Sequence, residues 1–309
     1  MTTTVRLGLV LPSREAVLWA GGDVAWVVER ARAAEVAGFD SVWVGESPLA
    51  RPRPDALVTL AAVAARTARV QLGTAVVLPL LRQAIGLAHA VATLDRLAGG
   101  RVILGVGPGA EVPSTDTELA SFGASTTGRV GRLLEAVSAC RRAWRADEPE
   151  ACLQPAPAQP GGPPVWLAAN GPRLLVQAGR HFDGWLPYSP SPAAYATGLE
   201  AVASAAAPRG RSVTPAVFLT AAVDDDPERA ADTLDNYMMA YYGLPAEAMA
   251  SVQAARAGTA EQIAGWATAY VDAGARHVLL RPACTDPAHY DETAAGLLGA
   301  VRGALPRAA

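Results

Sequence analysis

Short apolar runs alternate with longer helical runs along most of the chain, and this alternation limits the possible folds more than any other feature of the sequence. The runs that predict strands span 5–11, 41–45, 70–77, 101–107, 165–169, 183–187, 213–223 and 277–282. Helical patterns follow them at 23–38, 54–67, 83–100, 131–144, 172–180, 193–207, 227–273 and from about 291 to the end. Short strands that are apolar on both faces are typical of a parallel sheet covered by helices.

The number of these strand–helix units favours a closed (β/α)8 barrel, the TIM barrel, over an open sheet. Gly38 marks the end of the first helix and Pro54 the start of the second. The long helical stretch over 227–273, interrupted near Gly243 and Gly258, supplies an insertion over the C-terminal face. The Pro- and Gly-rich segment 149–164 is a surface connector, because the alternation resumes after it. We therefore expect a single domain over 1–309.

Composition excludes several classes of function. The net charge is −3 and aromatic residues make up 6%, which argues against nucleic acid as a partner. The chain has no lysine, since all 26 basic residues are arginine, and Schiff-base chemistry needs a lysine amine. Cys140, Cys152 and Cys284 are scattered, as expected of reduced thiols and not of a disulfide framework or a zinc site. Without a signal peptide or an apolar span long enough for a membrane, the protein is expected to be cytoplasmic.

A barrel of this kind carries its chemistry at the C-terminal ends of its strands. Glu46 and Ser47 follow the second expected strand, Thr74 and Ala75 lie at the end of the third, and Glu111 follows the fourth. The four histidines lie elsewhere, so no metal site is expected.

The segment GVGPGA (105–110) only superficially matches the dinucleotide-binding fingerprint. Pro108 and Pro113 are expected to prevent a helix from opening where a pyrophosphate would need one, and the segment belongs to the fourth unit instead of the first. Two interpretations stay open: a loop that lets a cofactor approach the backbone, and a flexible loop without a ligand.

The segment AANGPRLL (168–175) follows the fifth expected strand. Asn170 or Gly171 can cap the next helix, Pro172 fits its first position, and the free N–H groups there form an anion site. Arg173 adds a positive charge that the helix dipole disfavours unless an anion is near. Capping alone is the alternative.

Four large side chains gather before the last strand, Tyr237, Met238, Tyr241 and Tyr242. They indicate either core packing or a wall of a substrate pocket.

Five segments resemble, in order, the luciferase-like monooxygenase superfamily: GFDSVWVGE (38–46), RVQLGTAVVLPLLR (69–82), ATLDRLAGGRVILGVGPG (92–109), PPVWLAANGPRLLVQAGRHFDGWLP (163–187) and GTAEQIAGWATAYVDAGARHVLLRP (258–282). This superfamily includes flavin-dependent monooxygenases and oxidoreductases that use the deazaflavin coenzyme F420. The resemblance covers nearly the whole chain and implies a luciferase-like barrel with the cofactor ring over the strand ends.

The resemblance also implies site residues. Ala75-Val76, next to Thr74, would occupy a bulge behind the ring that is often a cis peptide. Gly107 and Gly109 would approach the cofactor tail, and Glu46 would match an acidic residue that contacts the deazaflavin. The phosphate would lie near the four residues of the fifth loop, Asn170, Gly171, Pro172 and Arg173.

Three departures from relatives restrict these implications. Many F420-dependent relatives carry histidine where this chain has Ser47, and many carry glutamate where it has Ala110, with Glu111 one position later. A serine hydroxyl is too weak an acid to replace histidine directly. Sugar-phosphate-oxidising relatives bind the phosphate with a lysine, so that activity is not expected here.

The sequence therefore predicts an F420-dependent oxidoreductase that transfers a hydride to or from a small organic substrate. Glu111 or Glu46 is expected to donate or accept the proton, with Ser47 as a hydrogen-bonding orienter. The alternatives are an FMN-dependent monooxygenase that uses O2 and a flavin- or deazaflavin-binding protein without catalysis. Apolar helices after the second and third strands, together with the family's usual dimers, predict a homodimer.

Overall fold

The computed structural model describes residues 4–145 and 153–305, and within these ranges eight parallel strands close into a barrel. The barrel strands are β1 (Arg6–Val10), β2 (Ser41–Val44), β3 (Gln71–Thr74), β4 (Val102–Val106), β5 (Val165–Leu167), β6 (Gly184–Trp185), β7 (Thr214–Val223) and β9 (His277–Pro282). Neighbouring strands pair in the order β6-β5-β4-β3-β2-β1-β9-β7, and pairing between β6 and β7 closes the ring. The predicted (β/α)8 barrel is therefore confirmed.

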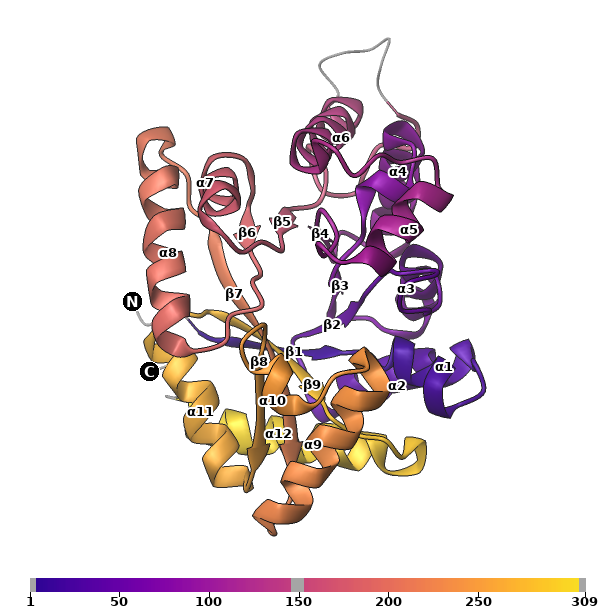
Figure 1. The fold of residues 1–309 in the computed structure, drawn as a ribbon. Coiled ribbons are helices and arrows are strands. Elements are labelled where there is room, and N and C mark those ends of the chain that lie inside the picture. The colour runs from indigo at the N-terminus through magenta and orange to yellow at the C-terminus, as the bar shows by residue number, and fades with distance from the viewer. Residues whose placement is uncertain (1–3, 146–152, 306–309) are drawn as a thin grey trace.

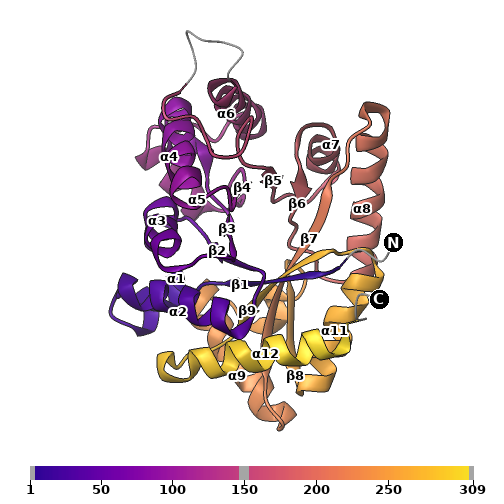
Figure 2. The same cartoon turned by 180° about the vertical axis from the view of Figure 1, so that it is seen from behind.

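Helices lie outside the ring of strands around most of its circumference, as the two opposite views in Figures 1 and 2 show. They are α1 (Ser13–Trp19), α2 (Val24–Ala37), α3 (Ala56–Arg66), α4 (Ala84–Leu97), α5 (Pro113–Ser121), α6 (Arg129–Trp144), α7 (Pro172–His181), α8 (Pro192–Ala206), α9 (Pro227–Tyr242), α10 (Ala246–Met249), α11 (Ala260–Asp272) and α12 (Tyr290–Ala304). Gly38 ends α2 with a positive φ of 98°, as predicted.

The prediction of a helical stretch over 227–273 is wrong in one part. It divides into α9, α10, a strand and α11, and the strand is β8 (Ala254–Gly258). β8 pairs in parallel with the second half of β7, which extends beyond the barrel. The sequence AARAG of β8 is short and rich in alanine, so it lacks the β-branched residues that indicate a strand.

Three helix starts differ from the prediction. The second predicted helix begins at Ala56, after Pro54, because the carboxylate of Asp55 caps it by accepting hydrogen bonds from the N–H groups of Leu57 and Val58. Helix α1 was not predicted. Pro113 begins α5, contrary to the expectation that it prevents a helix, because proline suits the first turn.

Large and small residues alternate inside the barrel. The interior cluster contains Val10, Trp43, Ile103, Trp166, Leu186, Ala216, Phe218 and Leu279. The rings of Trp43 and Trp166 lie 5.2 Å apart between centroids. Gly73 faces Trp43 so closely that an added Cβ would lie 2.0 Å from a ring atom. The indole fits because its register partner on the adjacent strand β3 has no side chain.

His277 is buried below these indoles. Its Nε2 lies 2.7 Å from the hydroxyl of Ser41, and its ring packs edge-on against Trp43. Burial, and to a smaller extent the charge of Arg6, lower the pKa of His277 to about 3. The folded protein therefore keeps this imidazole neutral at any pH above that value.

This burial predicts a loss of stability in mild acid. An unfolded histidine takes up a proton below about pH 6.5, whereas folded His277 does not until about pH 3. The free energy of unfolding should therefore fall by about 1.4 kcal/mol per pH unit below 6.5 from this group. Urea unfolding at pH 7.0 and 5.5 would measure this fall in the parent protein and in His277→Gln. An equal fall in unfolding free energy in both proteins would show that His277 is not its source.

The remaining predictions on composition concern thiols, metals and membranes. Cys140 and Cys284 are free and buried, while Cys152 lies outside the described residues. Over 4–145 and 153–305, no helix has the length and apolar character needed to cross a bilayer, and His, Cys, Asp and Glu side chains form no group of three that could hold a metal.

Candidate active site at the barrel mouth

The segment after β3 forms a bulge at the C-terminal ends of the strands. The peptide bond between Ala75 and Val76 is cis, the form that the resemblance implies at this point. The N–H of Ala75 donates to the carbonyl of Val44 at 2.8 Å, and the N–H of Glu46 donates to the carbonyl of Val76 at 3.0 Å. The bulge is thus tied to the end of β2.

Gly107 joins the bulge to the next two strands. Its N–H donates to the carbonyl of Val77 at 3.1 Å. A Cβ at this position would lie 2.9 Å from Cγ2 of Val76 and 3.8 Å from the carbonyl oxygen of Ala168. Glu46, Val76, Gly107 and the start of the fifth loop therefore lie side by side at one end of the barrel.

Thr74 and Gly109 fix the backbone on either side of the bulge through contacts with β4 and α5. Thr74 is fully buried, and its hydroxyl donates to the carbonyl of Gly105 at 2.6 Å, which joins β3 to β4. Gly109 has a φ of 82°, and a Cβ there would lie 2.9 Å from Cγ2 of Thr115 on α5. Both residues shape the backbone beside the bulge.

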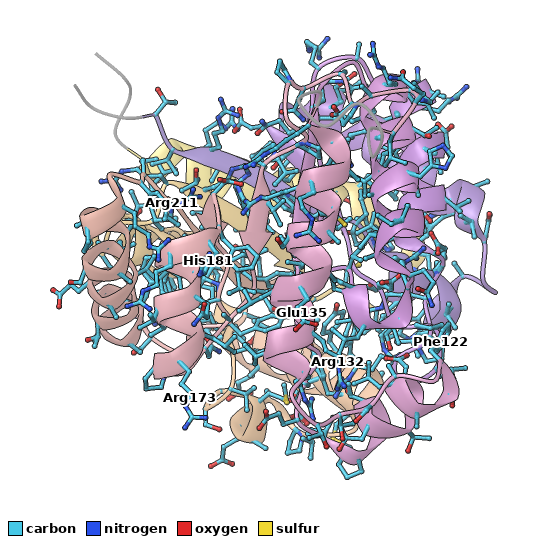
Figure 3. All side chains as sticks on the ribbon, turned by 90° about the horizontal axis from the view of Figure 1, so that it is seen from above. Phe122, Arg132, Glu135, Arg173, His181 and Arg211 are labelled. Carbon is cyan, nitrogen blue, oxygen red and sulfur yellow. The ribbon has the colours of Figure 1, made fainter. Side chains whose placement is uncertain are left out.

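The loop after β5 leads into α7, and the prediction for its residues holds for Gly171 and Pro172 but not for Asn170 as a cap. Gly171 is the N-cap, with a φ of 86°, and Pro172 follows in the first turn. Asn170 does not cap the helix; its side-chain amide donates to the carbonyl of Tyr188 at 2.6 Å. Arg173 is exposed at this end of α7, and Figure 3 shows it at the opposite end of the helix from His181.

Glu46 is held in an ion pair. Its carboxylate accepts hydrogen bonds from the N–H of Leu78 and from Nε of Arg82, each at 2.9 Å, and from a second nitrogen of the same guanidinium. Arg82 also contacts Asp55 at 2.6 Å. Burial alone would lower the pKa of Arg82, yet the hydrogen bonds and charges of Glu46 and then Asp55 raise it. Glu46 is thus a fixed carboxylate.

Ser47 is bound to a carboxylate that the sequence did not reveal. Its hydroxyl donates to Oε1 of Glu118 at 2.9 Å, and the same oxygen accepts the N–H groups of Leu49 and Ala50. Glu118 is 1% exposed, and its Oε2 is buried without a hydrogen-bond partner among the described residues. Glu118 lies on α5, whose start at Pro113 with Asp116 in its first turn is the signal that could have found it.

Glu111 stands apart from the other predicted residues. It is exposed before α5, and within the described chain it makes no hydrogen bond or ion pair. A cavity of about 190 Å³ is lined instead by residues that include Glu46, Ser47, Arg53, Arg82 and Phe122.

A larger hollow of about 500 Å³ is lined by residues of α6 and by the end of α7. Arg141, Arg145 and His181 are among the residues that line it. These residues lie at the C-terminal ends of their helices, away from the strand ends, so this hollow is separate from the candidate site.

The other side of the mouth holds a buried arginine. Arg281 is the penultimate residue of β9, is 2% exposed, and donates to the hydroxyls of Thr220 at 3.0 Å and Tyr242 at 2.9 Å. Its guanidinium lies over the ring of Tyr241 at 4.6 Å. The aromatic cluster of α9 therefore packs in the core and also surrounds a charged group at the strand ends.

Comparisons with known proteins agree with this architecture. A family model described as luciferase-like monooxygenase matches residues 5–279. An F420-dependent glucose-6-phosphate dehydrogenase of Amycolatopsis mediterranei is 37% identical over 179 residues, which are 52% of this chain and 52% of that protein. A phthiodiolone/phenolphthiodiolone dimycocerosates ketoreductase of Mycobacterium tuberculosis is 33% identical over 260 residues, or 71% of this chain and 67% of the ketoreductase. The match to the dehydrogenase spans about half of its length.

Solved structures share the fold at low sequence identity. An F420-dependent secondary alcohol dehydrogenase in complex with an F420-acetone adduct has a TM-score of 0.79 and 21% identity, over 97% of this chain and 99% of that chain. The oxygenating constituent of 3,6-diketocamphane monooxygenase of Pseudomonas putida, in complex with FMN, has a TM-score of 0.76 and 17% identity, over 98% and 99%. At these identities the likeness shows the barrel alone.

Proposed function

Since this chain belongs to the luciferase-like monooxygenase family of oxidoreductases, we propose that it transfers a hydride between coenzyme F420 and a small organic substrate. The observation that carries the proposal is the bulge at Ala75-Val76, which Gly107 backs and Glu46 borders. Relatives with 37% and 33% identity are named as an F420-dependent dehydrogenase and a ketoreductase, which supports this cofactor and this class of reaction.

We assign the cofactor site to the strand ends from β2 to β5. The ring would lie on the bulge formed by Thr74, Ala75 and Val76, with Glu46 at its edge. Gly107 and Gly109 would let the tail pass close to the backbone, because neither carries a side chain. The phosphate would lie at the start of α7, near Asn170, Gly171, Pro172 and Arg173, where the first turn of a helix favours an anion.

When bound, the deazaflavin would supply a two-electron acceptor or donor of hydride. The chain would position the substrate and move the accompanying proton. In the oxidation of an alcohol, the hydroxyl proton of the substrate would pass to Oγ of Ser47 as the proton of Ser47 passes to Glu118. The 2.9 Å hydrogen bond between Ser47 and Glu118 supports this relay, and so does the unpartnered Oε2 of that buried carboxylate.

This relay answers the objection that serine alone is too weak an acid or base. Glu46, which the sequence offers as a proton donor, is committed to Arg82 and would orient the cofactor edge instead. Glu111 stays the alternative acid or base, since a loop residue can move when a ligand binds.

Two other functions stay in competition. An FMN-dependent monooxygenase is supported by the fold shared with the oxygenating constituent of 3,6-diketocamphane monooxygenase, which was solved in complex with FMN. A binding protein without catalysis would keep the same loops. Titration of the purified protein with F420 and with FMN, followed by the fluorescence of each cofactor, tests the proposal: we expect F420 to bind at least about tenfold more tightly, a difference of about 1.4 kcal/mol. Preference for FMN would favour the monooxygenase.

We also propose a homodimer through α3 and α4. Val58 on α3 is 71% exposed, and Ile85 and Leu97 on α4 are 55% and 60% exposed. Apolar side chains this exposed on neighbouring helices favour burial against a second copy. Light scattering over a range of concentrations would measure the mass, and a monomer throughout would contradict the dimer.

A further inference from the structure

Four arginines converge on one aromatic cluster at the barrel mouth. Arg14 comes from α1, Arg51 and Arg53 from the loop after β2, and Arg281 from the end of β9. The guanidinium carbons of Arg14, Arg53 and Arg281 lie 5.1, 5.7 and 4.6 Å from the centroid of the Tyr241 ring. That of Arg51 lies 5.2 Å from the ring of Tyr242. Segments far apart in the sequence thus bring four cations to two neighbouring rings.

None of these four arginines forms an ion pair within the described ranges. Arginines elsewhere in the chain do, for example Arg82 with Glu46, Arg211 with Asp183 and Arg229 with Asp224. Instead, Nε of Arg14 donates to the carbonyl of Tyr241 at 3.1 Å and Nε of Arg53 to the carbonyl of Arg51 at 3.2 Å. These partners are neutral, so none of these hydrogen bonds places a carboxylate directly on a guanidinium of the cluster.

One carboxylate lies in the cluster. Glu15 is 3% exposed and accepts the hydroxyl of Tyr237, which packs against Tyr241 and beneath Arg281. Burial lowers the pKa of Arg14, and the charges of Arg53 and Arg51 lower it further, although Tyr241 and Glu15 act in the opposite direction. Like charges in a buried site repel one another strongly, so an arrangement of this kind favours a negatively charged ligand.

The cluster borders the proposed cofactor site. A Cβ at Gly45 would lie 2.5 Å from Nη1 of Arg53 and 3.0 Å from the carbonyl oxygen of Ala75. Arg281 lies 5.0 Å above the ring of Phe218, and Ala75 and Val76 pack against the same interior cluster that contains Phe218. A ligand held by the arginines would therefore lie next to the bulge.

We propose that Arg14, Arg51, Arg53 and Arg281 bind the carboxylate or phosphate group of an anionic substrate, an inference that rests on the proposed function for the identity of the site. Guanidinium groups suit such oxyanions because their N–H donors match two oxygens at once. The rings of Tyr241 and Tyr242 lie within about 6 Å of the guanidiniums and restrict where they can lie. The anionic end would be fixed here, while the reacting carbon reaches toward Ala75-Val76.

Binding of inorganic phosphate and of malonate to the protein without cofactor tests this inference. Isothermal titration calorimetry should show binding of at least one of the two anions, and comparison of the two distinguishes a phosphate site from a carboxylate site. Arg281→Gln should weaken that binding by about tenfold or more, because it removes a buried charge-assisted donor. Arg51→Gln, at a more exposed position, should weaken it as well and guards against misfolding of the first variant, with circular dichroism as the check.

Two further variants complete the experiment. Arg229→Gln, on the surface of α9, should leave anion binding unchanged. Arg173→Gln reports on the proposed cofactor-phosphate site at α7. Loss of binding with Arg173→Gln but not with Arg281→Gln or Arg51→Gln would overturn the inference, and so would the absence of binding by either anion.

The anion titrations and the F420 titration can fail independently of each other. If F420 binds and neither phosphate nor malonate does, the proposed function stands and the substrate class is wrong. If the anions bind in an Arg281-dependent way and F420 does not, the anion site stands and the cofactor assignment fails.

Discussion

Gly73→Ala is expected to lower the free energy of unfolding by about 3 kcal/mol or more, the upper range for overpacking a core. An added Cβ would lie 2.0, 2.3 and 2.4 Å from three ring atoms of Trp43. Trp43 is fully buried and cannot move aside, because Trp166 and His277 pack against it with centroid distances of 5.2 and 5.5 Å. The melting temperature should fall by roughly 4–5 °C or more for a chain of this length.

The same substitution at an open helical glycine is the matched control. At Gly299 on α12 an added Cβ meets no atom within 4 Å, so Gly299→Ala should raise stability by about 0.5–1 kcal/mol through helix propensity. Differential scanning calorimetry of both variants measures the contrast. A melting temperature for Gly73→Ala equal to that of the parent protein would show that the indole is packed differently.

Glu118→Gln is expected to lower turnover by about 100- to 1000-fold, the range for the loss of a general base. The glutamine oxygen can still accept hydrogen bonds from Ser47, Leu49 and Ala50, so the loop after β2 should keep its shape. What is lost is the ability to take a proton from Ser47. Reduction of F420 with the best substrate from a panel of hydroxycarboxylic acids and sugar phosphates measures turnover, and F420 affinity should stay within about threefold.

Two comparisons decide whether the relay is correct. Ser47→Ala should cause a similar loss, and the double variant should be no slower than either single one, because residues that act as a unit are not additive. Glu111→Gln should change turnover by less than about threefold. A large loss with Glu111→Gln and a small one with Glu118→Gln would return the proton transfer to the exposed glutamate.

Most of the fold could be predicted because apolar periodicity reports directly on burial. The barrel strands bury both faces, so their Val- and Leu-rich runs stand out, and Gly38 and Pro172 mark helix ends by their own backbone preferences. The sequence does not predict β8. Its pairing with the extended half of β7 is a tertiary contact, and its alanines fit a helix equally well. The sequence does not predict α5, because a proline can either break a helix or begin one, and Pro113 begins this one.

Some residues of the candidate site could likewise be predicted from the sequence, and others could not. Glu46 and Gly107 could be predicted since each follows a strand directly, and strand ends meet in a barrel. Glu118 could not, because it reaches Ser47 from a helix some seventy residues further along the chain. The arginine cluster draws on α1, the loop after β2 and the end of β9, and no local pattern connects these segments.

The absence of lysine excludes fewer substrates than composition alone indicates. It excludes a lysine ligand for a substrate phosphate, and with it the arrangement known from sugar-phosphate-oxidising relatives. It does not exclude an anionic substrate, because Arg53 and Arg281 place cations at the mouth without any carboxylate partner within the described ranges. The expectation from the sequence concerns sugar-phosphate oxidation through a lysine, and binding of an anion by arginine is a different arrangement.

A crystal structure of the protein soaked with F420 would show directly whether the strand ends hold the cofactor. We expect the deazaflavin ring against the Ala75-Val76 bulge, beside Glu46, with the phosphate at the first turn of α7 near Gly171 and Arg173. Density for the ring in the hollow lined by α6 and α7, or a phosphate bound away from α7, would contradict this placement.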